Sequence, residues 1–133
     1  MSDRRVARPS GTPPPAQAPW ADGALPLAPL AGEVAARHLA AHPDDAERYG
    51  ERLAHEWAAH DMQHVLAWAF GEAAGFVALD QQVGWLARVL GARGYPLVNL
   101  ADCLRTAAEV VDERVEGASA VAARLRDVAA GVA

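Results

Sequence analysis

The chain has 133 residues, a single cysteine and a formal net charge of −5, which together exclude several classes of protein. One cysteine rules out an intrachain disulfide and a cysteine-rich zinc site, and the lack of a basic face argues against nucleic acid as a partner. No apolar run reaches the length of about 18 residues that spans a bilayer, so we expect no membrane segment and a cytoplasmic protein. The hydrophobic fraction of 52% consists mostly of Ala, Leu and Val, which favours helices over strands.

The first 29 residues form a lead that contains seven of the nine prolines, including a run of three at positions 13–15. Proline cannot donate the backbone hydrogen bonds of a helix, so the lead is predicted to be extended or disordered. Its spaced apolar residues, Trp20 and Leu27 among them, could hold it against the rest of the chain as a strap. Residues 30–133 are predicted to form one helical domain.

Five segments after the lead carry apolar residues at helical spacing, which predicts five helices. The first is expected over residues 30–41, because Pro43 disfavours helix in the residue before it. The second is expected as one long central helix over residues 44–72, since Asp44 and Glu47 have the spacing of a capping box. Apolar side chains cover nearly every direction over its last two turns, so we expect that end to be buried all round.

The later helices are separated by glycines, which commonly end helices. The third helix is expected to carry the strongest amphipathic pattern of the chain, formed by Phe76, Leu79, Val83, Leu86 and Leu90. A fourth helix is predicted to begin with Asn99 as its cap, and a fifth to follow Gly117. The elements predict an all-α fold, either a four- to five-helix bundle or globin-like, with no strands and with Cys103 as a small core residue.

One face of the predicted central helix combines aromatic rings with imidazoles. At about 100° per residue its members fall together, and they are Trp57, His60, His64 and Trp68. We expect this face to point inward, where an imidazole without a hydrogen-bond partner costs about 1–3 kcal/mol. Asp61 lies beside it and could fix an imidazole tautomer. The candidate ligand-binding residues are Trp57, His60, His64 and Trp68, together with Trp85 from the next helix. The alternative is that the histidines form hydrogen bonds within an ordinary core.

The histidines also permit a metal or haem site. His38 with His42, and His60 with His64, are spaced i and i+4, which places two ring nitrogens on one side of a helix. The donors of this alternative would be His38, His60, His64 and Glu56. They would hold a divalent transition metal, or two imidazoles would hold a haem. Outside this alternative we expect no cofactor.

Signatures of enzymes are absent from the sequence. It contains no glycine-rich phosphate loop and no G-x-S-x-G motif. The stretch that begins at His55 is one residue too long for a zinc-protease HExxH motif, because the second histidine is His60. We therefore expect no catalytic residues, and a small cytoplasmic enzyme remains only a third interpretation.

Three stretches resemble a family of bacterial signalling domains. Residues 61–70 contain a histidine followed by an apolar helix, residues 83–96 contain a Trp-Leu-x-x-x-Leu run and an Ala-Arg-Gly-x-Pro corner, and residues 100–105 complete the set. Together they resemble the helical domain that precedes cobalamin-binding or STAS-type modules in actinobacterial regulators. That domain is similar to the non-haem globin-like sensor domains of stressosome proteins. The resemblance covers about residues 45–115.

Membership of this family would imply a sensory or interaction domain that often forms homodimers through its helices. The chain departs from the family between Phe70 and Val83, and no cobalamin-binding or STAS module follows, so no cobalamin ligand is carried over. We therefore expect a non-catalytic regulatory or protein-interaction module that acts in trans on a protein partner and forms a homodimer. A ligand or partner would bias the packing of the central helix.

Overall fold

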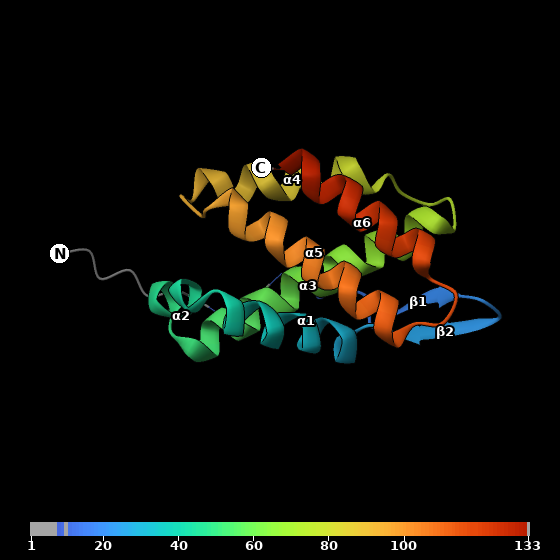
Figure 1. Cartoon of the computed structure of the whole chain (residues 1–133), viewed down its shortest axis with the longest axis horizontal. Helices are drawn as coiled ribbons and strands as arrows, with labels where there is room; N and C mark the ends of the chain where they lie inside the picture. Colours follow the sequence, from blue (N-terminus) through green and yellow to red (C-terminus); the bar gives the residue numbers. More distant parts are fainter. Residues whose placement is uncertain (1–7, 10, 133) are drawn as a thin grey trace.

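In a computed structural model, residues 8, 9 and 11–132 are described, and they form six helices and one short hairpin (Figure 1). In chain order the elements are β1 (Gln17–Trp20), β2 (Gly23–Pro26), α1 (Ala28–Ala41), α2 (Pro43–Tyr49), α3 (Glu51–Ala73), α4 (Leu79–Ala92), α5 (Leu97–Arg114) and α6 (Ser119–Val132). The predicted all-α bundle is confirmed. Within the described ranges, no helix has both the length and the apolar character needed to cross a bilayer.

The core lies where α1, α3, α5 and α6 meet. α5 and α6 share the most extensive helix–helix contact, and α1 packs against both α3 and α5. Its largest fully buried side chains include Phe70, Met62, Leu66, Leu104 and Leu125. α4 covers one side of this core and buries only Leu79, Val83 and Leu86. The other faces of α4 therefore lie outside the core.

Residues 17–26 of the predicted amino-terminal lead form an ordered hairpin. β1 pairs with β2 in antiparallel register, from Gln17 opposite Pro26 to Trp20 opposite Gly23. A two-stranded hairpin leaves one edge of each strand unpaired, and proline is tolerated at such edges. The expectation that the chain has no strands, and the option of disorder for this part of the lead, were therefore wrong.

The hairpin is held against the bundle as the predicted strap. The indole Nε1 of Trp20 donates to the backbone oxygen of Glu116 at 3.2 Å, and its ring meets Phe70 edge-on with centroids 5.1 Å apart. Leu27 is fully buried. Before the hairpin, the side chain of Gln63 on α3 donates to the backbone oxygen of Pro15 at 2.9 Å. Residues 1–7 and 10 of the predicted lead lie outside the described part of the chain.

The predicted long central helix is divided in two at Gly50. Gly50 has a φ of +82°, which L side chains rarely adopt, so α2 ends there and α3 starts in a new direction. α2 begins at Pro43 and has no side-chain cap, so Asp44 and Glu47 do not form the predicted capping box. α3 then runs on to Ala73. The element that was predicted as one helix thus contributes a short arm and a long central helix.

Two residues, Phe76 and Asn99, do not hold the helix positions predicted for them. Phe76 was assigned to the amphipathic face of the third helix, but α4 begins only at Leu79 and the Phe76 side chain is 76% exposed. Asn99 was predicted to cap the fourth helix, but α5 begins at Leu97. The Asn99 amide instead points toward α2, and this difference reveals a buried polar cluster.

Four buried or half-buried polar residues, His38, Asp45, Tyr95 and Asn99, meet in what we call the Asp45 cluster. Asp45 is only 4% exposed, and its carboxylate lies 2.9 Å from Nε2 of His38. It accepts hydrogen bonds from the Tyr95 hydroxyl at 2.5 Å and from the Asn99 amide at 3.0 Å. Burial alone would raise the pKa of Asp45, but the hydrogen bonds from His38, Tyr95 and Asn99 outweigh it and hold this pKa below its usual value. The cluster joins α1, α2, α5 and the corner before α5.

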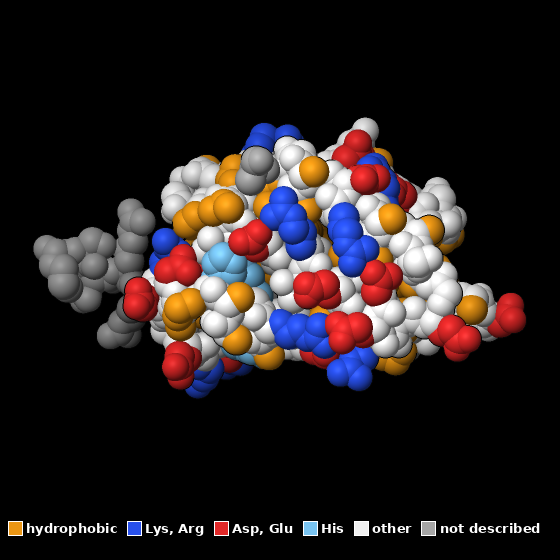
Figure 2. Space-filling view, in the orientation of Figure 1, with side chains coloured by type: hydrophobic (Ala, Val, Ile, Leu, Met, Phe, Trp, Pro, Cys, Tyr) orange, Lys and Arg blue, Asp and Glu red, His pale blue; other side chains and the backbone are white. Residues whose placement is uncertain are grey.

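Ion pairs connect α1 and α5 at the surface. Arg37 pairs with Glu113 at 2.5 Å, and Arg114 pairs with Glu33 at 3.0 Å. Figure 2 shows basic and acidic side chains interspersed on the face that these helices share. Exposed pairs of this kind contribute little each, so we assign the stability of the fold to the core and the Asp45 cluster.

Replacing Tyr95 with Phe is expected to lower the free energy of unfolding by about 1–3 kcal/mol, because the buried Asp45 carboxylate loses one donor. Urea denaturation measures the change. Tyr49→Phe is the matched control, since the Tyr49 ring stacks on Tyr95 with centroids 6.4 Å apart and its hydroxyl bonds no residue that the structure describes. Equal denaturation midpoints for the two variants would contradict this role of the cluster.

Candidate functional site

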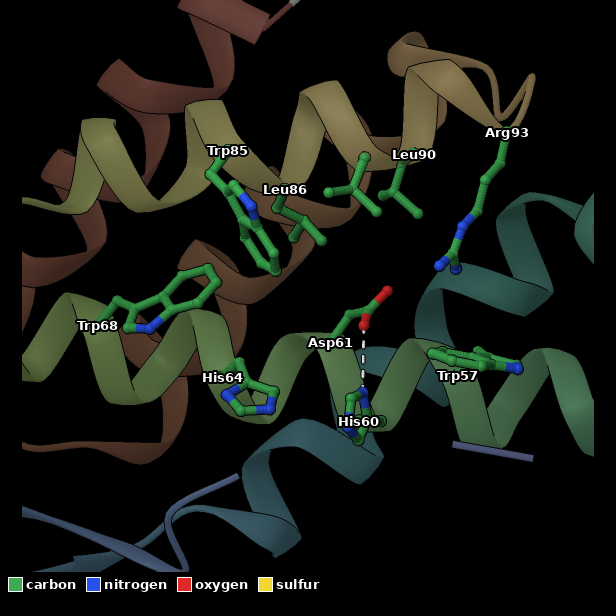
Figure 3. Close-up of a pocket in the computed structure, with 10 residues that line it drawn as sticks. Trp57, His60, Asp61, His64, Trp68, Trp85, Leu86, Leu90 and Arg93 are labelled. Atoms are coloured by element: carbon green, nitrogen blue, oxygen red, sulfur yellow. Dashed lines mark hydrogen bonds and ion pairs between the residues drawn. The ribbon is translucent and has the colours of Figure 1, made fainter. Parts of the chain in front are cut away.

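The five residues predicted to bind a ligand line one groove between α3 and α4 (Figure 3). The groove has a volume of about 370 Å³ and is called the α3/α4 groove below. From α3 it receives Trp57, His60, Asp61, His64 and Trp68. From α4 and the residue after it come Trp85, Leu86, Val89, Leu90 and Arg93.

The α3 wall of the groove is a continuous row of rings. The centroids of Trp57 and His60 are 5.5 Å apart, at nearly perpendicular planes. His60 and His64 follow at 4.9 Å, and His64 and Trp68 at 5.9 Å. The row forms because residues three and four apart lie on the same side of a helix. Helical spacing therefore predicted correctly which residues stand together.

The direction of this row differs from the expectation. The opposite face of α3 enters the core, with Met62, Val65 and Phe70 at most 2% exposed. The imidazoles of His60 and His64 are only half-buried and face the groove. The prediction that this row points inward was wrong, because the core already takes the more apolar side of the helix. The alternative of histidines satisfied within the core describes His38 but not His60 or His64.

Asp61 and the burial of His64 determine the tautomer of His60 and the charge of His64 on this wall. His60 Nδ1 lies 3.2 Å from Oδ1 of Asp61, a geometry in which the ring donates and Asp61 selects its tautomer. Burial lowers the pKa of His64, and the neighbouring His60 lowers it further, while Asp61 opposes both effects. His64 is therefore neutral at pH 7 and offers one donor and one acceptor nitrogen.

The α4 wall combines an exposed ring with a cation. Trp85 is 51% exposed, whereas the next residue, Leu86, is buried. Arg93 directs its guanidinium toward the groove (Figure 3) and forms no hydrogen bond or ion pair with any residue in the described ranges. The sequence reasoning did not select Arg93, although Trp85, Val89 and Arg93 are spaced i, i+4 and i+8 on one side of α4.

The donors proposed for a metal are not assembled. His38 belongs to the Asp45 cluster, and Glu56 pairs with Arg8 at 3.1 Å. Only His60 and His64 line the groove. Across residues 8, 9 and 11–132, no group of three or more His, Cys, Asp or Glu side chains is arranged to hold a metal ion. The prediction that these four donors lie together was therefore wrong, and only the imidazoles of His60 and His64 are neighbours in the groove.

His42 and Cys103 lie away from the groove. The His42 ring stacks on His38 with centroids 4.6 Å apart, and its Nε2 is 3.1 Å from Oδ2 of Asp102. Cys103 is buried, as expected for a core residue, and burial raises the pKa of its thiol. A thiol held in its neutral form is a poor nucleophile.

The imidazole of His64 is expected to titrate below the usual histidine pKa of about 6.5. His60→Gln should raise the pKa of His64, since it removes a neighbouring positive charge, whereas Asp61→Asn should lower it further. Titration of the ring C–H signals by NMR measures both shifts. A His64 pKa above about 6.5 in the unmodified protein would contradict its burial in the groove wall.

No family model, curated protein or solved structure matches this chain. The resemblance of residues 61–70, 83–96 and 100–105 to helical domains of actinobacterial regulators therefore stays a prediction. The groove and its residues are the features from which a function has to be argued.

Proposed function

We propose that this protein is a non-catalytic regulatory module that binds a small, flat organic molecule in the α3/α4 groove. The observation that carries the proposal is the lining of the groove, in which Trp57, Trp68 and Trp85 accompany a few polar groups. Small-molecule sites commonly have volumes of about 300–1,000 Å³ and are lined mainly by apolar and aromatic side chains. The groove volume of about 370 Å³ lies in this range.

A short connection in the chain between the groove and the Asp45 cluster supports a regulatory role. Arg93 at one end of the groove is two residues before Tyr95, whose hydroxyl donates to Asp45 on α2. A ligand that moves the end of α4 would thus change the geometry of the Asp45 cluster. Coupling of this kind needs a ligand that binds one arrangement of the corner better than another.

The wider role is proposed from the family resemblance and from the chemistry of the lining. The module would act in a cytoplasmic bacterial signalling system, as a homodimer, and would meet a protein partner in trans. The described residues that line the groove include no hydroxyl, thiol or amine nucleophile, and its imidazoles and carboxylate lie beside three tryptophans that suit a bound ring. This lining supports binding over covalent chemistry.

The neutral, apolar dye N-phenyl-1-naphthylamine is a direct probe of the groove. We expect it to bind the protein with energy transfer from the groove tryptophans, and Trp85→Ala to weaken its affinity by about tenfold, since an aromatic contact adds about 0.5–1.5 kcal/mol beyond its buried area. Fluorescence titration measures the affinity. Light scattering on the same samples gives the molar mass with and without dye. It tests whether the protein is a homodimer and whether the dye changes its oligomeric state.

Phe76→Ala is the matched control for this titration, because it also removes an exposed aromatic ring but lies outside the groove lining. Its dye affinity should equal that of the unmodified protein. Equal losses in Trp85→Ala and Phe76→Ala, or no loss in either, would mean that the dye does not use the groove, and the proposed function would fail.

Haem binding is the second candidate, favoured by the side-by-side rings of His60 and His64 in the groove. Either imidazole could serve as an axial ligand. Under the proposed function, addition of hemin gives no histidine-dependent shift of the Soret band. A shift that is lost in the His60→Ala/His64→Ala double variant, measured by absorption spectroscopy, would replace the proposal with a haem sensor.

A further inference from the structure

We infer that the ligand of the α3/α4 groove is a neutral, planar heteroaromatic molecule with a lactam-type edge, in which a carbonyl oxygen and an N–H lie side by side. The inference rests on the proposed function, because it names the chemical class of ligand for the same groove. Its basis is a pair of polar side chains, Asp61 and Arg93, that face each other without meeting.

Asp61 and Arg93 point toward one another from opposite walls of the groove (Figure 3), yet they form no ion pair. Asp61 uses Oδ1 for His60, and its Oδ2 accepts no hydrogen bond from the described part of the chain. The Asp61 side chain is only 19% exposed. The groove thus presents a free acceptor and a free set of donors with space between them.

A lactam edge complements both groups at once. Its N–H donates to the Asp61 carboxylate, and its carbonyl oxygen accepts from the Arg93 guanidinium, so each hydrogen bond has one charged partner. A ligand with a net charge fits less well. An anion would gain Arg93 but face Asp61, and a cation would gain Asp61 but face Arg93.

The rings on either side of this pair provide surfaces for a flat ligand. Figure 3 shows Trp57 near Arg93, and Trp68 with Trp85 toward the other end of the groove, with Asp61 between them. Stacking on an aromatic face tolerates different ring systems, whereas hydrogen bonds to a carboxylate and a guanidinium require a particular edge. The tryptophans would therefore provide affinity for a planar ring, and Asp61 with Arg93 would select its polar edge.

Three small probes of similar size test the edge by isothermal titration calorimetry on the full chain. The probe 2-quinolone has the lactam edge, 2-methoxyquinoline lacks the N–H, and 2-naphthoate has a carboxylate. We expect 2-quinolone to bind at least tenfold more tightly than the other two. Asp61→Leu and Arg93→Met should each weaken 2-quinolone binding about tenfold. Arg88→Met, an exposed position on α4 outside the groove lining, should leave it unchanged.

The outcomes separate this inference from the proposed function. Equal affinity for 2-quinolone and 2-methoxyquinoline, or tighter binding of 2-naphthoate that depends on Arg93 alone, would overturn the lactam class. So would failure of 2-quinolone to bind while the naphthalene dye still binds in a manner that depends on Trp85. Loss of all binding, the dye included, would instead overturn the groove as a ligand site. Circular dichroism confirms that each variant is folded.

Discussion

The structure depends on one buried carboxylate, that of Asp45. Three donors from different parts of the chain converge on it, His38 from α1, Tyr95 from the corner before α5, and Asn99 from α5. A carboxylate so far from water is tolerated only when its oxygens are hydrogen-bonded, so the cluster specifies one relative arrangement of these elements. His38 Nδ1 is buried and has no hydrogen-bond partner among residues 8, 9 and 11–132, which is consistent with a ring whose Nε2 carries the proton. The corner that carries Arg93 is placed by the same arrangement.

The groove exists because the two faces of α3 differ in chemistry and the apolar face of α4 is too narrow to cover the row of rings as well as the core. The core takes the aliphatic face of α3, while the row of tryptophans and histidines is left toward α4. α4 reaches the core through Leu79, Val83 and Leu86, and its Trp85 lies outside the core, in the groove beside α3. A hollow with aromatic walls results, rather than a closed helix–helix contact.

The composition and the periodicity of apolar residues were sufficient to predict the all-α fold and the set of rings that line the groove. They could not predict which face of α3 packs in the core, because helical spacing shows only which residues share a face. The row from Trp57 to Trp68 was therefore assigned to the core. Gly50 was overlooked since a single glycine within a helical pattern usually only weakens it. The hairpin was missed because prolines argue against strands except at unpaired edges. Asp61 and Arg93 come together only through the packing of α3 on α4, which no local pattern reports.

The docking of the hairpin has a consequence for the order of folding. Trp20 bonds the backbone of Glu116, a residue 96 positions later, and its ring rests on Phe70. During synthesis the hairpin leaves the ribosome before the helices, but its docking site is complete only when the turn between α5 and α6 has emerged. Contacts so distant in sequence are costly in chain entropy and form late. An element that is made before the helices is thus placed after most of them, and until then the Trp20 and Leu27 side chains remain exposed to chaperones or to other chains.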